Sequence, residues 1–247
     1  MRQESVYFYT LHRCASSLFS GYVLRNVRGL RLIDYEDRLY NGEPVDPMTF
    51  EKRGFIYGPI RLSYRPQSLI YKTFVSHVSR TDFIRGKIAI FFIRDPRDLL
   101  VSSYYSFGYT HGFSKVKQIN EQQCELRDKI RRKTIDTYAL EQAKQLLICL
   151  QTADALVRTC RRGLVLRYED MICNWQKFSS ALTMELDFDE PVLCQTYDLS
   201  RPLDKENLTS HRRSGRPGAY REELSASTVA ALNVLFAPVF ARYQYEA

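Results

Sequence analysis

Three short segments of the chain combine arginines with serines, glycines or a helix start, which suits the binding of phosphate or sulfate. The first is residues 9–18, between a β-branched and aromatic run at 6–9 and an amphipathic stretch. Arg13 supplies a guanidinium, and Ser16 and Ser17 supply hydroxyl donors. Backbone N–H groups at a strand-to-helix turn can hold an anion, which the helix dipole also favours. The segment contains no glycine and is not a Walker A loop. Alone, such a loop is more often a structural turn than a binding site.

The second segment follows the most apolar run of the chain, residues 87–94. Arg94 ends that run, and Ser102 follows eight residues later, about two helical turns away. An arginine at the exit of a buried strand needs an anionic partner, and a phosphate suits its donor fork. The alternative is a capped helix with surface ion pairs between Arg97 and nearby acids, which would contribute little to stability.

The third segment, residues 211–221, holds four arginines, two glycines and one proline. This composition predicts a basic loop, which in isolation is most often a solvated surface loop. Its candidate anion-binding residues are Arg213, Ser214 and Gly215.

Together and in this order, the segments resemble the PAPS-dependent sulfotransferases (PAPS is 3′-phosphoadenosine-5′-phosphosulfate). Residues 9–18 resemble their 5′-phosphosulfate loop, 94–102 their 3′-phosphate motif, and 213–218 their late Arg-x-Gly-x-x-Gly segment. Residues 166–171 resemble their Tyr-Glu-Asp strand end, whose tyrosine lies near the adenine. The resemblance implies that the donor is bound by Arg13, Cys14, Ala15, Ser16, Ser17, Leu18, Arg94, Ser102, Tyr168, Arg213, Ser214 and Gly215.

The resemblance also implies the reaction. An acceptor attacks sulfur in line, and negative charge develops on the oxygen that leaves with PAP, the desulfated nucleotide. Arg13, Lys72 and the N–H groups of residues 15–18 are expected to stabilise that charge. No obligatory metal is implied. The expected acceptor is a small molecule, lipid or carbohydrate with a hydroxyl or amine, and not a nucleic acid.

The chain departs from the family pattern at three places. Arg13 stands where lysine is usual, and Ala15 stands where glycine is usual. At the expected catalytic strand, cytosolic members of the family often have Lys-Thr-His, whereas this chain has Lys72-Thr73-Phe74. Phe74 cannot accept a proton, so the general base must lie elsewhere.

A histidine suits the role of general base because its pKa lies near neutral pH. We predict His77, just beyond the expected strand, or His111, in the region where family members line the acceptor pocket. An acidic residue such as Glu36 or Glu43 is the alternative.

Strands and helices alternate along the chain. The predicted strands are 6–9, 69–75, 87–94 and 163–168. The predicted helices are one that begins at Pro96 after the N-cap Asp95, 134–160, one capped by Asn174, and 225–243. The alternation predicts a single α/β domain over residues 1–247, with a mostly parallel central sheet flanked by helices. The resemblance adds a P-loop-like nucleotide-binding architecture, with ligands beyond the carboxyl ends of the strands.

The size and composition of the chain are compatible with this fold. It has 247 residues, of which 45% are hydrophobic types. Its longest purely apolar run, residues 88–93, is too short to span a bilayer, and its first residues lack the apolar core of a signal peptide. Six cysteines without a Cys-x-x-Cys pair predict reduced, mostly buried thiols and a cytoplasmic protein. A homodimer is compatible with the sequence, which does not fix the oligomeric state.

Two other functions are compatible with the net charge of +8. A P-loop nucleotide kinase would need a Walker A lysine and a magnesium-binding carboxylate, and the sequence indicates neither. A non-catalytic polyanion binder would need a continuous basic and aromatic surface, and its affinity should fall steeply with salt.

Overall fold

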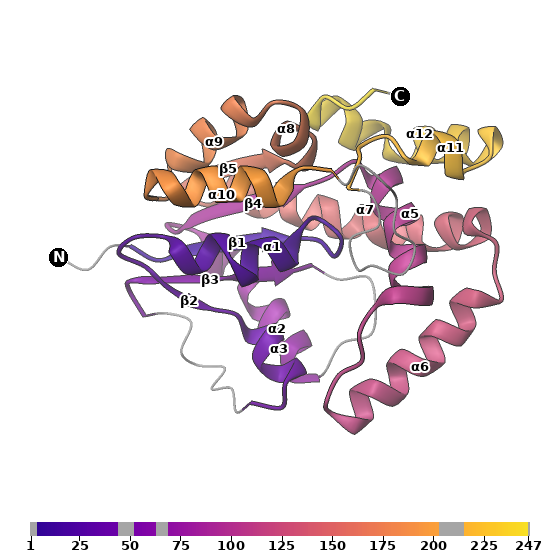
Figure 1. Cartoon of the computed structure of the whole chain (residues 1–247), viewed down its shortest axis with the longest axis horizontal. Coiled ribbons are helices and arrows are strands. Elements are labelled where there is room, and N and C mark those ends of the chain that lie inside the picture. The colour runs from indigo at the N-terminus through magenta and orange to yellow at the C-terminus, as the bar shows by residue number, and fades with distance from the viewer. Residues whose placement is uncertain (1–3, 44–51, 63–68, 203–214, 247) are drawn as a thin grey trace.

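Within the residues described by the computed structural model (4–43, 52–62, 69–202 and 215–246), five parallel strands form one sheet. Their order is β2-β3-β1-β4-β5 (Figure 1). The strands are β1 (Val6–Thr10), β2 (Arg31–Ile33), β3 (Phe55–Arg61), β4 (Ile88–Ile93) and β5 (Arg162–Arg167). Because all neighbouring pairs are parallel, the carboxyl ends of the strands lie at one edge of the sheet.

The described helices join and cover these strands. They are α1 (Ser16–Gly21), the 3₁₀ helix η1 (Val23–Asn26), α2 (Tyr35–Tyr40), α3 (Leu69–Val78), α4 (Thr81–Ile84), α5 (Pro96–Tyr105), the π-helical turn η3 (Ser106–Thr110), α6 (Lys117–Arg131), α7 (Ile135–Thr159), α8 (Tyr168–Cys173), α9 (Trp175–Thr183), α10 (Glu190–Ser200), α11 (Tyr220–Glu223) and α12 (Ala226–Tyr243).

Successive side chains of β1 pack against helices on opposite faces of the sheet. Phe8 stacks on Phe19 of α1, with ring centroids 4.8 Å apart, and Phe19 in turn contacts Phe178 of α9. Tyr7 points the other way and meets Phe83 of α4 at 5.4 Å, on the side where α4 packs against α7. Every residue of β1 and β4 is buried, as expected for strands covered on both faces.

The predicted strand at 69–75 is wrong, because these residues lie in helix α3. Tyr71, Phe74 and Val78 are buried at helical spacing, while Lys72 is exposed. The aromatic and β-branched run is too short for its periodicity to separate strand from helix.

The strand that pairs with β1 on the side away from β4 is β3. Its Gly58–Pro59 dipeptide weakens the strand signal in the sequence. The structure nevertheless requires a glycine here, because Gly58 has a φ of 145° and a Cβ would lie 2.5 Å from the Phe8 carbonyl oxygen. β3 ends at Arg61, at the same edge of the sheet as the first arginine loop.

The predicted helix starts are confirmed. Asp95 caps α5 by accepting from the Arg97 N–H at 2.9 Å, and Pro96 is the first helical residue. The side chains of Thr134, Asn174 and Ser225 cap α7, α9 and α12 in the same way. The predicted strands at 6–9, 87–94 and 163–168 correspond to β1, β4 and β5.

By length and composition, α12 is the one described helix that could cross a membrane. A core helix passes the same test, and α12 packs against α7 and α5. The finding is therefore weak evidence of a membrane span.

The six cysteines are free of disulfides, as predicted. The prediction that most of them are buried is wrong, since Cys124, Cys173 and Cys194 are exposed.

Candidate active site

Two residues in the left-handed conformation shape the loop between β1 and α1. Arg13 has a φ of 73° and Ala15 a φ of 48°, a region that costs an L-residue about 1–2 kcal/mol. This gives a physical reason for the glycine usual at the position of Ala15. The Arg13 side chain extends toward α5, where its Nε donates to Ser102 Oγ at 3.2 Å. Backbone strain of this kind is concentrated at functional sites.

Arg94 is held in a buried position at the end of β4. Its guanidinium lies 4.4 Å from the ring centroid of Tyr168, and its Nη1 donates to the Arg13 carbonyl oxygen at 3.2 Å. Its Nη2 lies 3.8 Å from Asp98 Oδ2. Among the residues that the structure describes, Arg94 Nε has no hydrogen-bond partner. Arg94 also lines the adjoining cavity, where its positive charge favours an anion.

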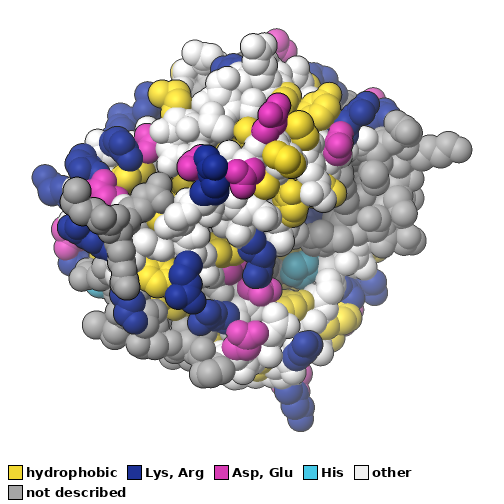
Figure 2. All heavy atoms as spheres, turned by 60° about the vertical axis from the view of Figure 1, so that its left-hand side comes forward, with side chains coloured by type: hydrophobic (Ala, Val, Ile, Leu, Met, Phe, Trp, Pro, Cys, Tyr) yellow, Lys and Arg dark blue, Asp and Glu magenta, His cyan; other side chains and the backbone are white. Residues whose placement is uncertain are grey.

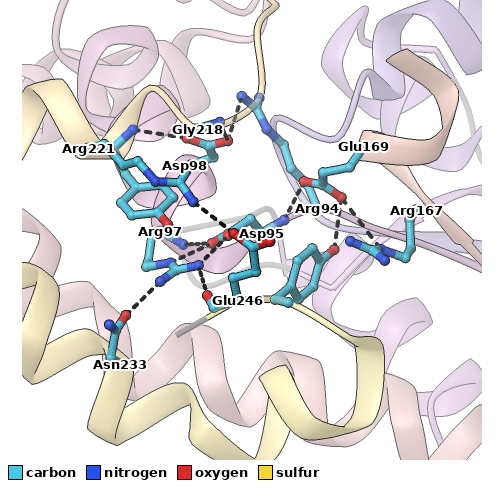
Figure 3. A network of polar contacts seen from close by, with 12 residues as sticks. Arg94, Asp95, Arg97, Asp98, Arg167, Glu169, Gly218, Arg221, Asn233 and Glu246 are labelled. Atoms are coloured by element: carbon cyan, nitrogen blue, oxygen red, sulfur yellow. Dashed lines mark hydrogen bonds and ion pairs between the residues drawn. The ribbon is translucent and has the colours of Figure 1, made fainter. Parts of the chain in front are cut away.

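Asp98, one turn into α5, holds the late basic segment in place. Its buried carboxylate accepts from the N–H of Gly218 at 2.7 Å and of Tyr220 at 3.1 Å (Figure 3). Burial raises the pKa of Asp98, while Arg94 and the Gly218 N–H lower it. Sequence analysis had assigned no role to this residue.

The same segment is joined to the end of β5. The Tyr168 hydroxyl, at the start of α8, donates to the Gly215 carbonyl oxygen at 2.6 Å. Two of the predicted donor ligands in this segment, Arg213 and Ser214, lie outside the described residues.

Arg97 is buried, so the alternative interpretation of it as a surface ion-pair residue is wrong. Its Nε and Nη2 donate to the two carboxylate oxygens of Asp95 at 3.1 and 2.7 Å. Nη1 donates to Asn233 Oδ1 at 2.7 Å, and Nη2 also donates to the Glu246 carbonyl oxygen at 2.5 Å (Figure 3). Arg97 therefore joins the start of α5 to α12 and to the segment that follows it.

Glu169, from the Tyr-Glu-Asp stretch, supports the same helix start. Its Oε1 accepts from the Asp95 N–H at 2.9 Å, and its Oε2 accepts from the Tyr245 hydroxyl at 3.1 Å (Figure 3). Burial raises the pKa of Glu169, and the Asp95 N–H lowers it.

These elements enclose a first cavity at the carboxyl edge of the sheet. Nine of the twelve predicted donor ligands line it: Arg13, Ala15, Ser16, Ser17, Leu18, Arg94, Ser102, Tyr168 and Gly215. Cys14 lies on the predicted loop but does not line the cavity. Its thiol is fully buried, and burial raises its pKa to about 12, so it is uncharged at neutral pH.

A second cavity adjoins the first and shares Arg13, Ser16 and Ser17 with it. Its other lining residues are His12, Ser20, Glu36, Asp37, Tyr40, Arg61, Phe107, His111 and Gly112. The shared residues belong to the loop after β1, so one loop forms part of both walls.

A cluster of ionisable side chains lies in and beside the second cavity. Glu36 Oε2 accepts from Arg61 Nη1 at 2.9 Å, and Glu36 Oε1 lies 3.7 Å from His12 Nε2. Asp34, the N-cap of α2, lies 3.7 Å from Arg61 Nη1. Burial raises the pKa of Asp34 to about 6, although Arg61 lowers it. Burial lowers the pKa of Arg61, but Glu36 and Asp34 raise it further, so Arg61 remains a cation.

Two of the four predicted catalytic residues line a cavity, and the other two lie on α3 away from both cavities. Arg13 and His111 line the second cavity. Lys72 and His77 lie on α3 and line neither cavity, as far as the described residues define them. Lys72 is exposed, and the His77 ring lies edge-on to Phe83 at 4.9 Å.

Sequence analysis assigned no role to His12 or Arg61. His12 directly precedes the arginine of the first loop, which is a signal that could have been used. Arg61 could not be found in this way, because the strand that it ends was not predicted.

Among the described residues, no group of three or more His, Cys, Asp or Glu side chains could hold a metal ion. Independence from metal remains a prediction.

Solved structures that contain PAP resemble this one. The crystal structure of mouse sulfotransferase SULT7A1 complexed with PAP aligns with 97% of this chain and 84% of its own, with a TM-score of 0.55 and 12% sequence identity. The chain has the sulfotransferase fold. Two retinol dehydratase structures, one with androsterone and the inactive cofactor PAP and one with retinol and PAP, align with 97% of this chain and with 81% and 82% of theirs. Their TM-scores are 0.44 and 0.41, at 15% and 12% identity. No family model and no curated protein matches the sequence.

Proposed function

We propose that this protein is a sulfotransferase that transfers the sulfuryl group of PAPS to an acceptor hydroxyl or amine and releases PAP. The observation that carries the proposal is the first cavity. It gathers arginine, serine and backbone donors from the loops after β1, β4 and β5 and from the segment before α11, which are far apart in the sequence.

The residues that line the two cavities suggest where the 3′-phosphate and the 5′-phosphosulfate of PAPS bind. The buried cation Arg94 and the Ser102 hydroxyl on α5 both line the first cavity, so this wall is proposed to bind the 3′-phosphate. Arg13, Ser16 and Ser17 belong to both cavities and are proposed to bind the 5′-phosphosulfate. The sulfur would then face the second cavity.

The reaction follows from this placement. The acceptor oxygen or nitrogen forms a bond to sulfur as the bond between sulfur and the bridging phosphate oxygen breaks. The electron pair of that bond leaves with PAP. Arg13 stabilises the charge on the leaving oxygen, and the proton of the acceptor passes to a base in the second cavity.

We propose His12 as that base, assisted by Glu36, in place of the sequence-based choice of His77 or His111. His12 adjoins Arg13 in the chain, which brings it close to the reacting sulfur. A carboxylate near one imidazole nitrogen orients the ring and stabilises its protonated form, and Arg61 in turn fixes Glu36. His111 lies farther along the same cavity and is assigned to acceptor binding.

Calorimetry with PAP, without added metal, tests the proposal. PAP should bind, ATP with magnesium should bind more weakly, and Arg94→Ala should raise the PAP dissociation constant by about 30-fold or more, as loss of a buried charge-assisted contact commonly does. Arg28→Ala is the matched control, because Arg28 pairs with Asp187 and Asp189 on the surface. Binding of ATP with magnesium but not of PAP would favour the kinase instead.

The polyanion-binding alternative makes a different prediction. Figure 2 shows one face on which basic side chains lie among acidic and hydrophobic ones rather than in a continuous band. An oligonucleotide that bound as tightly as PAP, with a steep salt dependence, would support that alternative. Cytoplasmic location and a homodimer remain predictions.

A further inference from the structure

We infer that the second cavity accepts a neutral, hydroxyl-rich acceptor, a saccharide, rather than a lipophilic phenol or sterol. This inference rests on the proposed function, because it takes the second cavity as the acceptor site. Arg13, Ser16 and Ser17, which are proposed to bind the 5′-phosphosulfate, line both cavities. Among the described residues, the second cavity is therefore the space next to the sulfuryl end of the donor.

Most side chains in the described lining of this cavity carry a polar group. Phe107 is its one purely apolar side chain among the described residues. Pockets for drug-like apolar ligands are lined mainly by hydrophobic and aromatic side chains, with few polar groups. A sterol offers only one or two polar groups, so its rings would displace water from the polar groups that line this cavity without replacing the hydrogen bonds to that water, at a cost of about 1–3 kcal/mol for each group affected. Sugar hydroxyls both donate and accept, so they can satisfy these groups.

Helix α2 supplies polar side chains that can form hydrogen bonds with the hydroxyls of a ligand. Glu36 and Tyr40 are four residues apart and share a helix face, and Asp37 lies beside them at the exposed rim. A carboxylate accepts hydrogen bonds only, so Asp37 favours a ligand that donates them. The Tyr40 hydroxyl donates to the Gly112 carbonyl oxygen at 2.5 Å, which joins the end of α2 to the segment that follows η3.

Aromatic and imidazole rings also line this cavity. The ring centroid of Phe107 lies 5.8 Å from that of His12 and 5.5 Å from that of His111, and the His111 centroid lies 6.4 Å from that of Tyr40. Such rings can pack against the apolar face of a sugar while its hydroxyls bind to the polar groups of the same cavity.

The charges on the described lining favour a neutral sugar over an amine or a polyanion as the acceptor. The described lining carries two guanidinium groups, Arg13 and Arg61, and two carboxylates, Glu36 and Asp37. Arg61 is paired with Glu36, and Arg13 donates to Ser102. The formal charges cancel, so the wall has no excess of either sign that would demand a charged acceptor.

The test uses the full chain with labelled PAPS and four acceptors: lactose, N,N′-diacetylchitobiose, 4-nitrophenol and dehydroepiandrosterone. At least one disaccharide should show a kcat/KM about 10-fold or more above that of the phenol and the sterol. Saturation-transfer NMR on the PAP complex gives a second readout that does not need turnover. If neither disaccharide is sulfated or bound, the inference is overturned, whatever the other acceptors do. Failure of PAP itself to bind would instead refute the proposed function.

A matched pair of variants tests the role of the rim. Asp37→Asn should raise the KM for the active disaccharide by about 10-fold and leave the PAP dissociation constant unchanged. Asp82→Asn is the control, because Asp82 lies on α4, pairs with Arg80 on the surface and lines neither described cavity. Equal KM values for the two variants would remove Asp37 from the acceptor site.

Discussion

At the scale of single residues, the proposed chemistry depends on His12. Its imidazole is buried, and Nε2 lies 3.7 Å from Glu36 Oε1, within ion-pair distance of the carboxylate once His12 is protonated. His12→Asn keeps much of the shape and removes the proton acceptor. A positioned base is commonly worth about 100- to 10,000-fold, so kcat should fall at least 100-fold while PAP binding is unchanged.

The control for this prediction is His77→Asn, because His77 lies on α3 and contacts Phe83 instead of either cavity. It should leave kcat near normal, and Glu36→Gln should lower it. If His77→Asn or His111→Asn abolishes turnover while His12→Asn does not, the sequence-based assignment was correct and ours is not.

Ala15 carries backbone strain that can be measured. Its φ of 48° costs an L-residue about 1–2 kcal/mol, which glycine avoids at some cost in unfolded-state entropy. Ala15→Gly should therefore raise the free energy of unfolding by about 0.5–1 kcal/mol in urea denaturation. Ala231→Gly, the same change on the exposed face of α12, should lower it by about 1 kcal/mol. Effects of the same sign at both sites would show that Ala15 is unstrained.

At the scale of elements, helix α2 gives a pH-dependent prediction. Asp34 caps α2, and burial raises its pKa from 3.8 to about 6. Below about pH 3 the carboxyl is mostly protonated in both the folded and the unfolded state. As pH rises toward 6 the unfolded state ionises first, so the folded state loses stability relative to it, by up to about 3 kcal/mol above pH 6. Asparagine can still cap the helix but does not ionise.

Urea denaturation of the wild type and of Asp34→Asn at pH 4.5 and 7 checks this prediction. The asparagine variant should gain stability relative to the wild type on going from pH 4.5 to 7. A difference between the two proteins that is independent of pH would mean that Asp34 titrates normally.

The elements also show where sequence reasoning succeeds and fails. β4 and the capped start of α5 could be predicted because continuous apolar residues, an Asp cap and a Pro follow one another in the chain. β3 could not, because Gly58 is required by the approach of β1, a contact between residues 50 apart that leaves only a strand-breaking signal. The strand predicted at 69–75 is wrong because its apolar and aromatic residues form a helix whose buried side packs against α2 and α4.

The same distinction explains the candidate site. The first cavity could be largely predicted, because its arginine and serine ligands lie in short contiguous motifs. The second cavity could be predicted only in part. His111 and Glu36 were candidates from the sequence, but the cavity brings His12, Glu36 and Arg61 together from three separate segments, and no motif in the sequence links the three.

At the scale of the whole molecule, Arg97 joins α5 to α12 and to the segment after it. The chain offers a close control, because Arg80 pairs with Asp82 through the same two nitrogens but on the surface. Arg97→Lys keeps the charge and loses the double hydrogen bond, so it should lower the free energy of unfolding by about 2–3 kcal/mol. Arg80→Lys should change it by less than about 0.5 kcal/mol.

Thermal or urea unfolding measures both variants. If Arg97→Lys is as stable as Arg80→Lys, the buried contacts to Asp95, Asn233 and Glu246 do not hold these parts of the molecule together. PAP affinity measured on the same variant would show how far the support of α5 extends to the donor site.

The wall that the two cavities share also has a consequence for inhibitor design. Since Arg13, Ser16 and Ser17 line both spaces, a ligand in one cavity lies next to a ligand in the other. A compound that joins PAP to a sugar through a linker of a few atoms can therefore occupy both at once. The second moiety then binds at high effective concentration, so the joined compound should bind about 100- to 10,000-fold more tightly than PAP alone.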